Sequence, residues 1–71
     1  MADLALQSEH ITLAQAVKAV GLAGSGAQAK HLVRAGTVCV NGAVETQPGR
    51  KLVAGDRFGL SSGAEYTVSR G

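Results

Sequence analysis

The segment from Ser25 to Thr46 constrains this chain more than any other, because it combines a complete set of helix signals with a β-hairpin. Ser25 can accept a hydrogen bond from a free amide in the first helical turn, and Gln28 completes a capping-box pattern with it. Gly36 is the residue type at which helices commonly stop, in the left-handed conformation. A helix between Ser25 and Gly36 is therefore predicted.

This predicted helix has one apolar face and one basic face. Ala29, Leu32 and Val33 recur at the spacing that places them on the same side. The opposite side consists of Ala27, Lys30, His31 and Arg34. An ordinary solvated face can look like this, but no acidic residue offsets the cations here. We therefore interpret the basic face as a candidate phosphate-binding surface.

A β-hairpin is predicted directly after the helix. Val38 and Val40 alternate with polar or small residues, which is the pattern of a half-buried strand. Asn41-Gly42 is a strong hairpin signal, because both central positions of a type I′ turn need positive φ. Val44 and Thr46 continue the alternation on the expected return strand.

Residues 29–42, AKHLVRAGTVCVNG, resemble the central motif of the S4 (S-four) domain, a small RNA-binding domain named after ribosomal small-subunit protein four. The pattern of that family is Ala, a basic residue, Leu-Ile or Leu-Val two positions later, and then Gly-x-Val-x-Val-Asn-Gly. Residues 47–56, QPGRKLVAGD, are similar to the next family segment, in which a basic loop precedes a Gly-Asp turn. The resemblance extends from about Ile11 to Phe58, and stand-alone bacterial proteins are the expected relatives.

The resemblance implies an α+β fold in which a two-helix pair packs on a small, mainly antiparallel sheet of about four to five strands, the alpha-L motif. It also implies binding of structured RNA, either ribosomal or transfer RNA, by a ribosome-associated protein. Two departures weaken the expected cationic surface. Many members carry Arg where this chain has Gly26, and many carry a basic or polar residue where it has Cys39.

The remaining sequence fits one domain over residues 1–71. A short edge strand is expected at Asp3–Leu6, and a first helix is expected between Thr12 and Gly21, with Gln15 in a capping box. Pro48-Gly49 suits the centre of a type II turn. Two further strands are predicted over residues 57–60 and 65–69. The expected core consists of Leu13, Val17, Val20, Ala29, Leu32, Val33, Val38 and Val40, joined by Phe58, Leu60, Tyr66 and Val68.

The positive charge of the chain is concentrated in residues 24–54, where four cations face Glu45 alone, a net charge of +3 against +2 for the whole chain. Clustered cations attract polyanions and release counterions on binding. Phe58 and Tyr66 are the only aromatic residues, so base stacking on exposed rings is not expected and structured RNA is favoured. The candidate RNA-binding residues are Lys30, Arg34, Arg50 and Lys51, with Ala27, His31 and Asn41 at the margin of the same surface.

Other function classes find little support in the sequence. His10, His31 and Cys39 show no spacing of a catalytic triad or metal site, so we expect a non-enzyme without metal, cofactor or small-molecule substrate. No apolar run is long enough to span a membrane, and no signal peptide is evident. The lone cysteine fits a reducing cytoplasm, and a monomer is expected.

Two alternatives remain open. Small β-grasp sulfur carriers share the length and a similar hairpin, but they need a C-terminal Gly-Gly, whereas this chain ends Ser69-Arg70-Gly71. The second alternative is a protein-interaction module with an incidental basic face. RNA binding that survives charge reversal at Lys30 and Arg34 would favour this second alternative.

Overall fold

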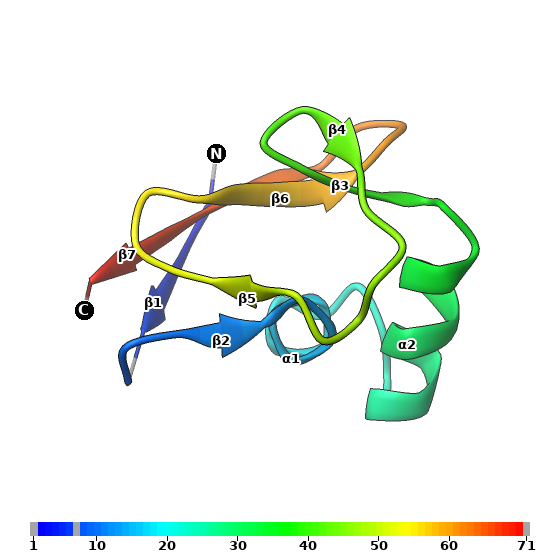
Figure 1. Ribbon diagram of the computed structural model, residues 1–71, viewed down its shortest axis with the longest axis horizontal. Coiled ribbons are helices and arrows are strands. Elements are labelled where there is room, and N and C mark those ends of the chain that lie inside the picture. The colour runs from blue at the N-terminus through cyan, green and yellow to red at the C-terminus, as the bar shows by residue number, and fades with distance from the viewer. Residues whose placement is uncertain (1, 7, 71) are drawn as a thin grey trace.

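The computed structural model describes residues 2–6 and 8–70, and it shows two adjacent helices packed against a five-stranded sheet (Figure 1). A second, two-stranded sheet lies beside the first helix. The expected α+β architecture is therefore confirmed. In chain order the elements are β1 (Ala2–Leu6), β2 (Ile11–Thr12), α1 (Leu13–Ala19), α2 (Gly26–Arg34), β3 (Val38–Val40), β4 (Ala43–Val44), β5 (Lys51–Leu52), β6 (Arg57–Leu60) and β7 (Glu65–Arg70).

Helix α1 begins and ends where the sequence predicts. The Thr12 hydroxyl accepts a hydrogen bond from the Gln15 amide, and the Gln15 side chain accepts one from the Thr12 amide, so the capping box is complete. Gly21 ends the helix with a φ of +83°. Its amide donates to the Lys18 carbonyl, and the next amide donates to the Val17 carbonyl, which is the Schellman arrangement.

Helix α2 differs from the prediction at its first turn. The Ser25 hydroxyl caps the Gln28 amide as expected. The Gln28 side chain, however, accepts from the Gly24 amide at 2.8 Å and not from Ser25, so the predicted capping box is only half formed. The chain turns sharply between the helices, and this turn brings the Gly24 backbone within reach of the Gln28 side chain. Gly36, with a φ of +79°, ends the helix as predicted.

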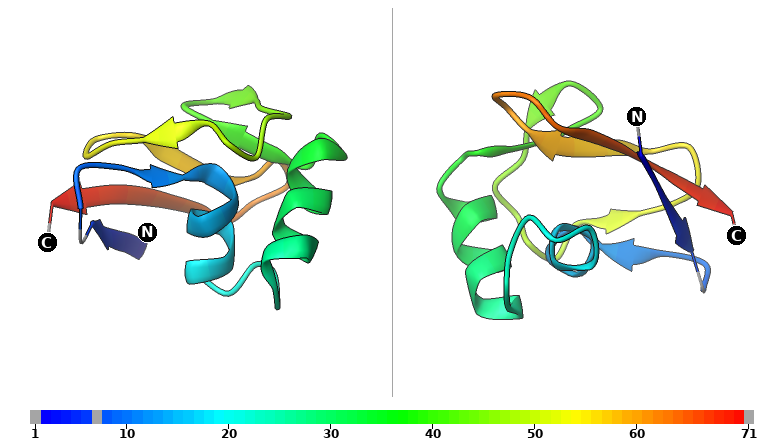
Figure 2. Two further views of the ribbon diagram at one scale, coloured as in Figure 1. Left: turned by 60° about the horizontal axis from the view of Figure 1, so that its bottom comes forward. Right: turned by 180° about the vertical axis from the view of Figure 1, so that it is seen from behind.

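The five-stranded sheet has the order β1-β7-β6-β3-β4. Strand β1 runs parallel to β7, and the other three pairs are antiparallel. The first and last strands thus lie side by side, with β1 at one edge of the sheet (Figure 2). The predicted edge strand at Asp3–Leu6 and the predicted last two strands are confirmed, within one residue at their ends.

The second sheet was not predicted. It consists of two residue pairs, Ile11 with Leu52 and Thr12 with Lys51. This pairing holds the loop before β5 against the start of α1, where the Leu13 amide donates to the Arg50 carbonyl at 2.8 Å. Strands of two residues have no periodicity of their own, so the sequence gives no local signal for them.

The two predicted turns have different outcomes. Asn41 and Gly42 have φ values of 52° and 87°, and Val40 pairs with Ala43, which confirms the type I′ hairpin. The return strand ends at Val44, before the expected Thr46. The type II prediction is wrong: residues 47–50 close a turn through a 3.1 Å backbone hydrogen bond, but Gly49 does not have positive φ. Proline at the second position suits a type I turn equally well.

The core lies between the helix pair and the sheet. Four expected core residues, Val20, Leu32, Leu60 and Tyr66, are only half-buried, whereas Leu52, which was not predicted, is fully buried. Phe58 and Tyr66 stack with their ring centroids 5.6 Å apart. The buried hydrophobic residues are Leu13, Ala14, Ala16, Val17, Ala23, Ala29, Val33, Val38, Val40, Leu52, Phe58 and Val68.

Candidate nucleic-acid interface

The helix pair carries exposed cations and contains no acidic residue of its own. From residue 10 to residue 44 the chain contains neither Asp nor Glu. Within this stretch Lys18 on α1 and Lys30 and Arg34 on α2 are all exposed. We call these three residues the helix-pair cations.

Two of the helix-pair cations share one hollow, although they come from different helices. The hollow has a volume of about 350 Å³ and lies between the start of α1, the start of α2 and the turn at residues 47–50. Its lining residues are Thr12, Ala14, Gln15, Lys18, Gly26, Lys30, Pro48 and Gly49. Two ammonium groups beside one concave surface attract a phosphate more strongly than either does alone.

Sequence reasoning missed Lys18. This residue lies in an N-terminal segment with a net negative charge, and its distance from the motif in the chain hides its proximity to Lys30. The long acid-free stretch was the signal that joins the two helices into one surface. Lys18 is therefore an additional member of the candidate interface.

Backbone amides at the two helix starts differ in their availability. The first amides of α1 are all satisfied, because Leu13 and Ala14 donate to carbonyls of the turn at residues 47–50 and Gln15 donates to Thr12. In α2, the amides of Gly26 and Ala27 have no acceptor among residues 2–6 and 8–70. These two donors lie at the positive end of the helix dipole, about one turn before Lys30.

Arg50 and Lys51, the two cations predicted in the loop after the hairpin, have different surroundings in the structure. The Arg50 guanidinium forms a 2.7 Å ion pair with the Glu45 carboxylate, so its charge is already compensated. This hydrogen bond from Arg50, followed by one from the Gln47 amide, lowers the pKa of Glu45 below its usual value. Lys51 is exposed, and no ion pair of Lys51 exists within the described part of the chain.

Asn41 has a structural role in the hairpin. Its carbonyl oxygen accepts from the Arg57 amide at 2.9 Å, and its side-chain nitrogen donates to Asp56 at 3.2 Å. Asp56 in turn accepts from the Val53 amide. These bonds join the hairpin turn to the turn before β6. Both polar atoms of the Asn41 side chain therefore already have partners within the protein, and this geometry does not support the expected contact of Asn41 with RNA.

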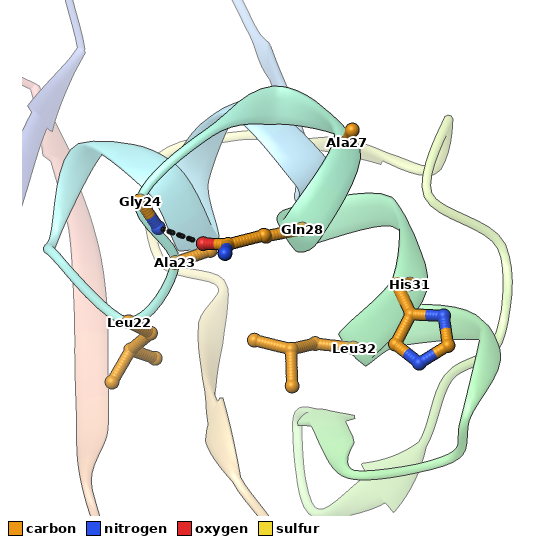
Figure 3. Close-up of a pocket in the computed structure, with 7 residues that line it drawn as sticks. All are labelled: Leu22, Ala23, Gly24, Ala27, Gln28, His31 and Leu32. Carbon is orange, nitrogen blue, oxygen red and sulfur yellow. Dashed lines mark hydrogen bonds between the residues drawn. The ribbon is translucent and has the colours of Figure 1, made fainter.

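Ala27 and His31 are exposed on α2 and line a second hollow, whose lining does not include Lys30 (Figure 3). In residues 2–6 and 8–70 no group of His, Cys, Asp and Glu side chains is arranged to hold a metal ion. No helix in the same residues is long and apolar enough to cross a membrane.

Comparison with known proteins gives consistent matches. The family model described as "S4 domain" matches residues 4–69. The "Putative RNA-binding protein YbcJ" of Escherichia coli K12 is 48% identical over 60 residues, which cover 84% of this chain and 86% of YbcJ. The "Uncharacterized protein YbcJ" of Shigella flexneri has the same identity and coverage. The solution structure of E. coli YbcJ, described as revealing an αL motif involved in RNA binding, matches with a TM-score of 0.72 and 38% identity, covering 97% of this chain and 87% of that one.

Proposed function

Because this chain belongs to the S4 domain family, we propose that it binds structured RNA through the cationic surface of α1 and α2. The family match and the relatives describe a binding domain and not an enzyme. The sulfur-carrier alternative is set aside, because the family match spans nearly the whole chain.

One observation carries the proposal: the helix-pair cations Lys18, Lys30 and Arg34 are exposed on two adjacent helices with no acidic residue in the segment that contains them. A surface of this kind favours polyanions through counterion release. Lys51 extends the positive charge toward the loop after the hairpin. The binding energy is therefore expected to be mainly ionic.

The aromatic residues indicate the class of RNA. Phe58 is buried and Tyr66 is half-buried against it, so neither ring forms a platform on which successive bases of a single strand stack. Phosphates at fixed spacing on a folded RNA suit rigid cations on helices better. We therefore favour a folded ribosomal or transfer RNA in the cytoplasm as the ligand.

The direct test is charge reversal with a matched control. Lys30→Glu combined with Arg34→Glu changes the net charge by −4, and so does Arg57→Glu combined with Arg70→Glu. Arg57 begins β6 and Arg70 ends β7, at the end of the molecule opposite α2 (Figures 1 and 2). All four side chains are exposed, so both variants should fold.

Both variants and the unmodified protein are titrated against ribosomal RNA fragments, transfer RNA and a matched duplex at several salt concentrations. We expect the helix variant to lose about tenfold or more in affinity and its salt dependence to flatten by roughly one unit per lost phosphate contact. The control variant should lose much less. Equal losses in the two variants would refute the assignment of the surface, and no binding by the unmodified protein would refute the function.

A further inference from the structure

The second hollow lies between the α1–α2 connection and α2. It has a volume of about 500 Å³, within the range of small-molecule pockets. Leu22 from the connection and Leu32 from α2 lie on two sides of it, and the Leu32 side chain extends toward Leu22 (Figure 3). Both leucines are only half-buried. The hollow is lined by Leu22, Ala23, Gly24, Ala27, Gln28, His31 and Leu32.

The rim of this hollow has unused hydrogen-bonding groups. The Gln28 carbonyl oxygen accepts from the Gly24 amide at 2.8 Å, but its side-chain nitrogen donates to no residue of the described chain. The His31 imidazole is exposed, and it too makes no hydrogen bond to residues 2–6 or 8–70. Two apolar walls with a few polar groups at one edge match the chemistry of a flat heterocycle, which has apolar faces and a polar edge.

The cations near the hollow indicate that the molecule containing this heterocycle is anionic. Lys30 precedes His31 in α2, and Arg34 follows it by one turn, so the hollow borders a cationic helix face. A molecule that enters the hollow and also contacts these cations is therefore anionic. An apolar peptide segment would fill the walls and leave the cations unused. A nucleotide of a polyanionic strand satisfies both.

We propose that this hollow receives one unpaired nucleobase of the bound RNA, held between Leu22 and Leu32 with its edge toward Gln28 and His31. The inference rests on the proposed function and makes it more specific. A base inside a regular helix is stacked and paired, so the nucleotide must come from a bulge, loop or junction, where it can be splayed out. Bases taken out of the stack are commonly held between aromatic or apolar side chains.

Three RNAs that differ at one position test the proposal. They are a perfect duplex, the same duplex with one bulged 2-aminopurine nucleotide, and the same bulge with an abasic nucleotide. The abasic bulge keeps the distorted backbone and removes only the base. We expect the unmodified protein to bind the base-containing bulge about fivefold or more tightly than either control RNA. The fluorescence of 2-aminopurine should also change on binding.

Two truncations locate the base on the protein. Leu32→Ala removes one wall of the hollow, and Val53→Ala removes a more exposed apolar side chain that does not line it. Leu32→Ala should lose the preference for the base while keeping its affinity for the perfect duplex. Val53→Ala should keep both. Circular dichroism establishes whether each variant is folded.

The outcomes separate this inference from the proposed function. Equal affinity for the base-containing and abasic bulges would overturn the base site and assign the hollow to another occupant, such as a protein partner. The comparison of the three RNAs needs no variant, so it stands even if Leu32→Ala fails to fold. A preference that survives in folded Leu32→Ala would also overturn the site. Absence of binding to all three RNAs would instead contradict the proposed function itself.

Discussion

Glu45 limits the positive charge of the candidate interface more than any other residue, because its carboxylate lies 2.7 Å from the Arg50 guanidinium. The sequence shows four cations and one acid between residues 24 and 54, but it does not show that the acid is paired with one of the predicted RNA ligands. Sequence spacing identified Lys30, Arg34 and Lys51 as exposed cations. The pairing of Arg50 and the structural role of Asn41 depend on side-chain geometry between separate turns.

Replacement of Glu45 by Gln should strengthen RNA binding. The change frees Arg50 to contact phosphate, so the salt dependence of the affinity should steepen by about one unit. The pKa of Glu45 is lower in the folded protein than in the unfolded chain, where it is about 4.3. The ion pair with Arg50 therefore stabilises the fold above a pH of about 4.3. This stabilisation is lost as the pH falls through the pKa of Glu45 in the folded protein. Thermal melts should therefore show a deficit for the variant at pH 7 that disappears in acid. An unchanged affinity would show that Arg50 does not contact RNA.

Gly26 offers a gain-of-function test at the first residue of α2. A side chain built there meets no atom within 4 Å, and the residue lines the hollow that contains Lys18 and Lys30. Gly26→Arg restores the cation that many family members carry at this position, and we expect it to steepen the salt dependence by about one unit. Gly26→Ala is the control, since it removes the glycine without adding charge. If both variants bind RNA as the unmodified protein does, this hollow does not contact the ligand.

The sequence correctly predicts those helix ends and turns that depend only on neighbouring residues. The caps at Thr12 and Ser25, the helix stops at Gly21 and Gly36 and the Asn41-Gly42 turn each depend on the chemistry of a few adjacent residues. The sheet formed by β2 and β5, the conformation of the turn at residues 47–50 and the burial of Leu52 depend on contacts between distant segments. The apolar spacing of α2 likewise identified its inner face without showing that Leu32 lies at the edge of that face.

The correction to the core gives an expected difference between two leucines. Leu52→Ala removes a fully buried side chain from the junction of the small sheet with α1, and should cost about 2–5 kcal/mol of unfolding free energy. Leu32→Ala should cost less than about 2 kcal/mol, because the side chain is already partly exposed in the hollow. Urea denaturation of both variants measures the difference. A larger loss for Leu32→Ala would place Leu32 in the core after all.

At the scale of the whole molecule, the fold brings two helices with no acidic residues together at one end of the domain, and the turn at residues 47–50 closes the hollow between them. The family motif in the sequence identified the α2 half of this surface. Lys18 enters it only through the packing of α1 against α2. The remaining exposed cations, Arg57 and Arg70, lie near the opposite end of the sheet.

Nuclear magnetic resonance can locate the RNA-binding surface directly, by mapping backbone amide chemical shifts while a folded RNA is added to the isotope-labelled protein. We expect the largest changes on α1 around Lys18, on α2, and on residues 47–51. Amides of β1 and of the C-terminal end of β7 should change little. The largest changes at β1 and β7, with unchanged amides in α2, would contradict the assignment of the helix pair as the RNA-binding surface.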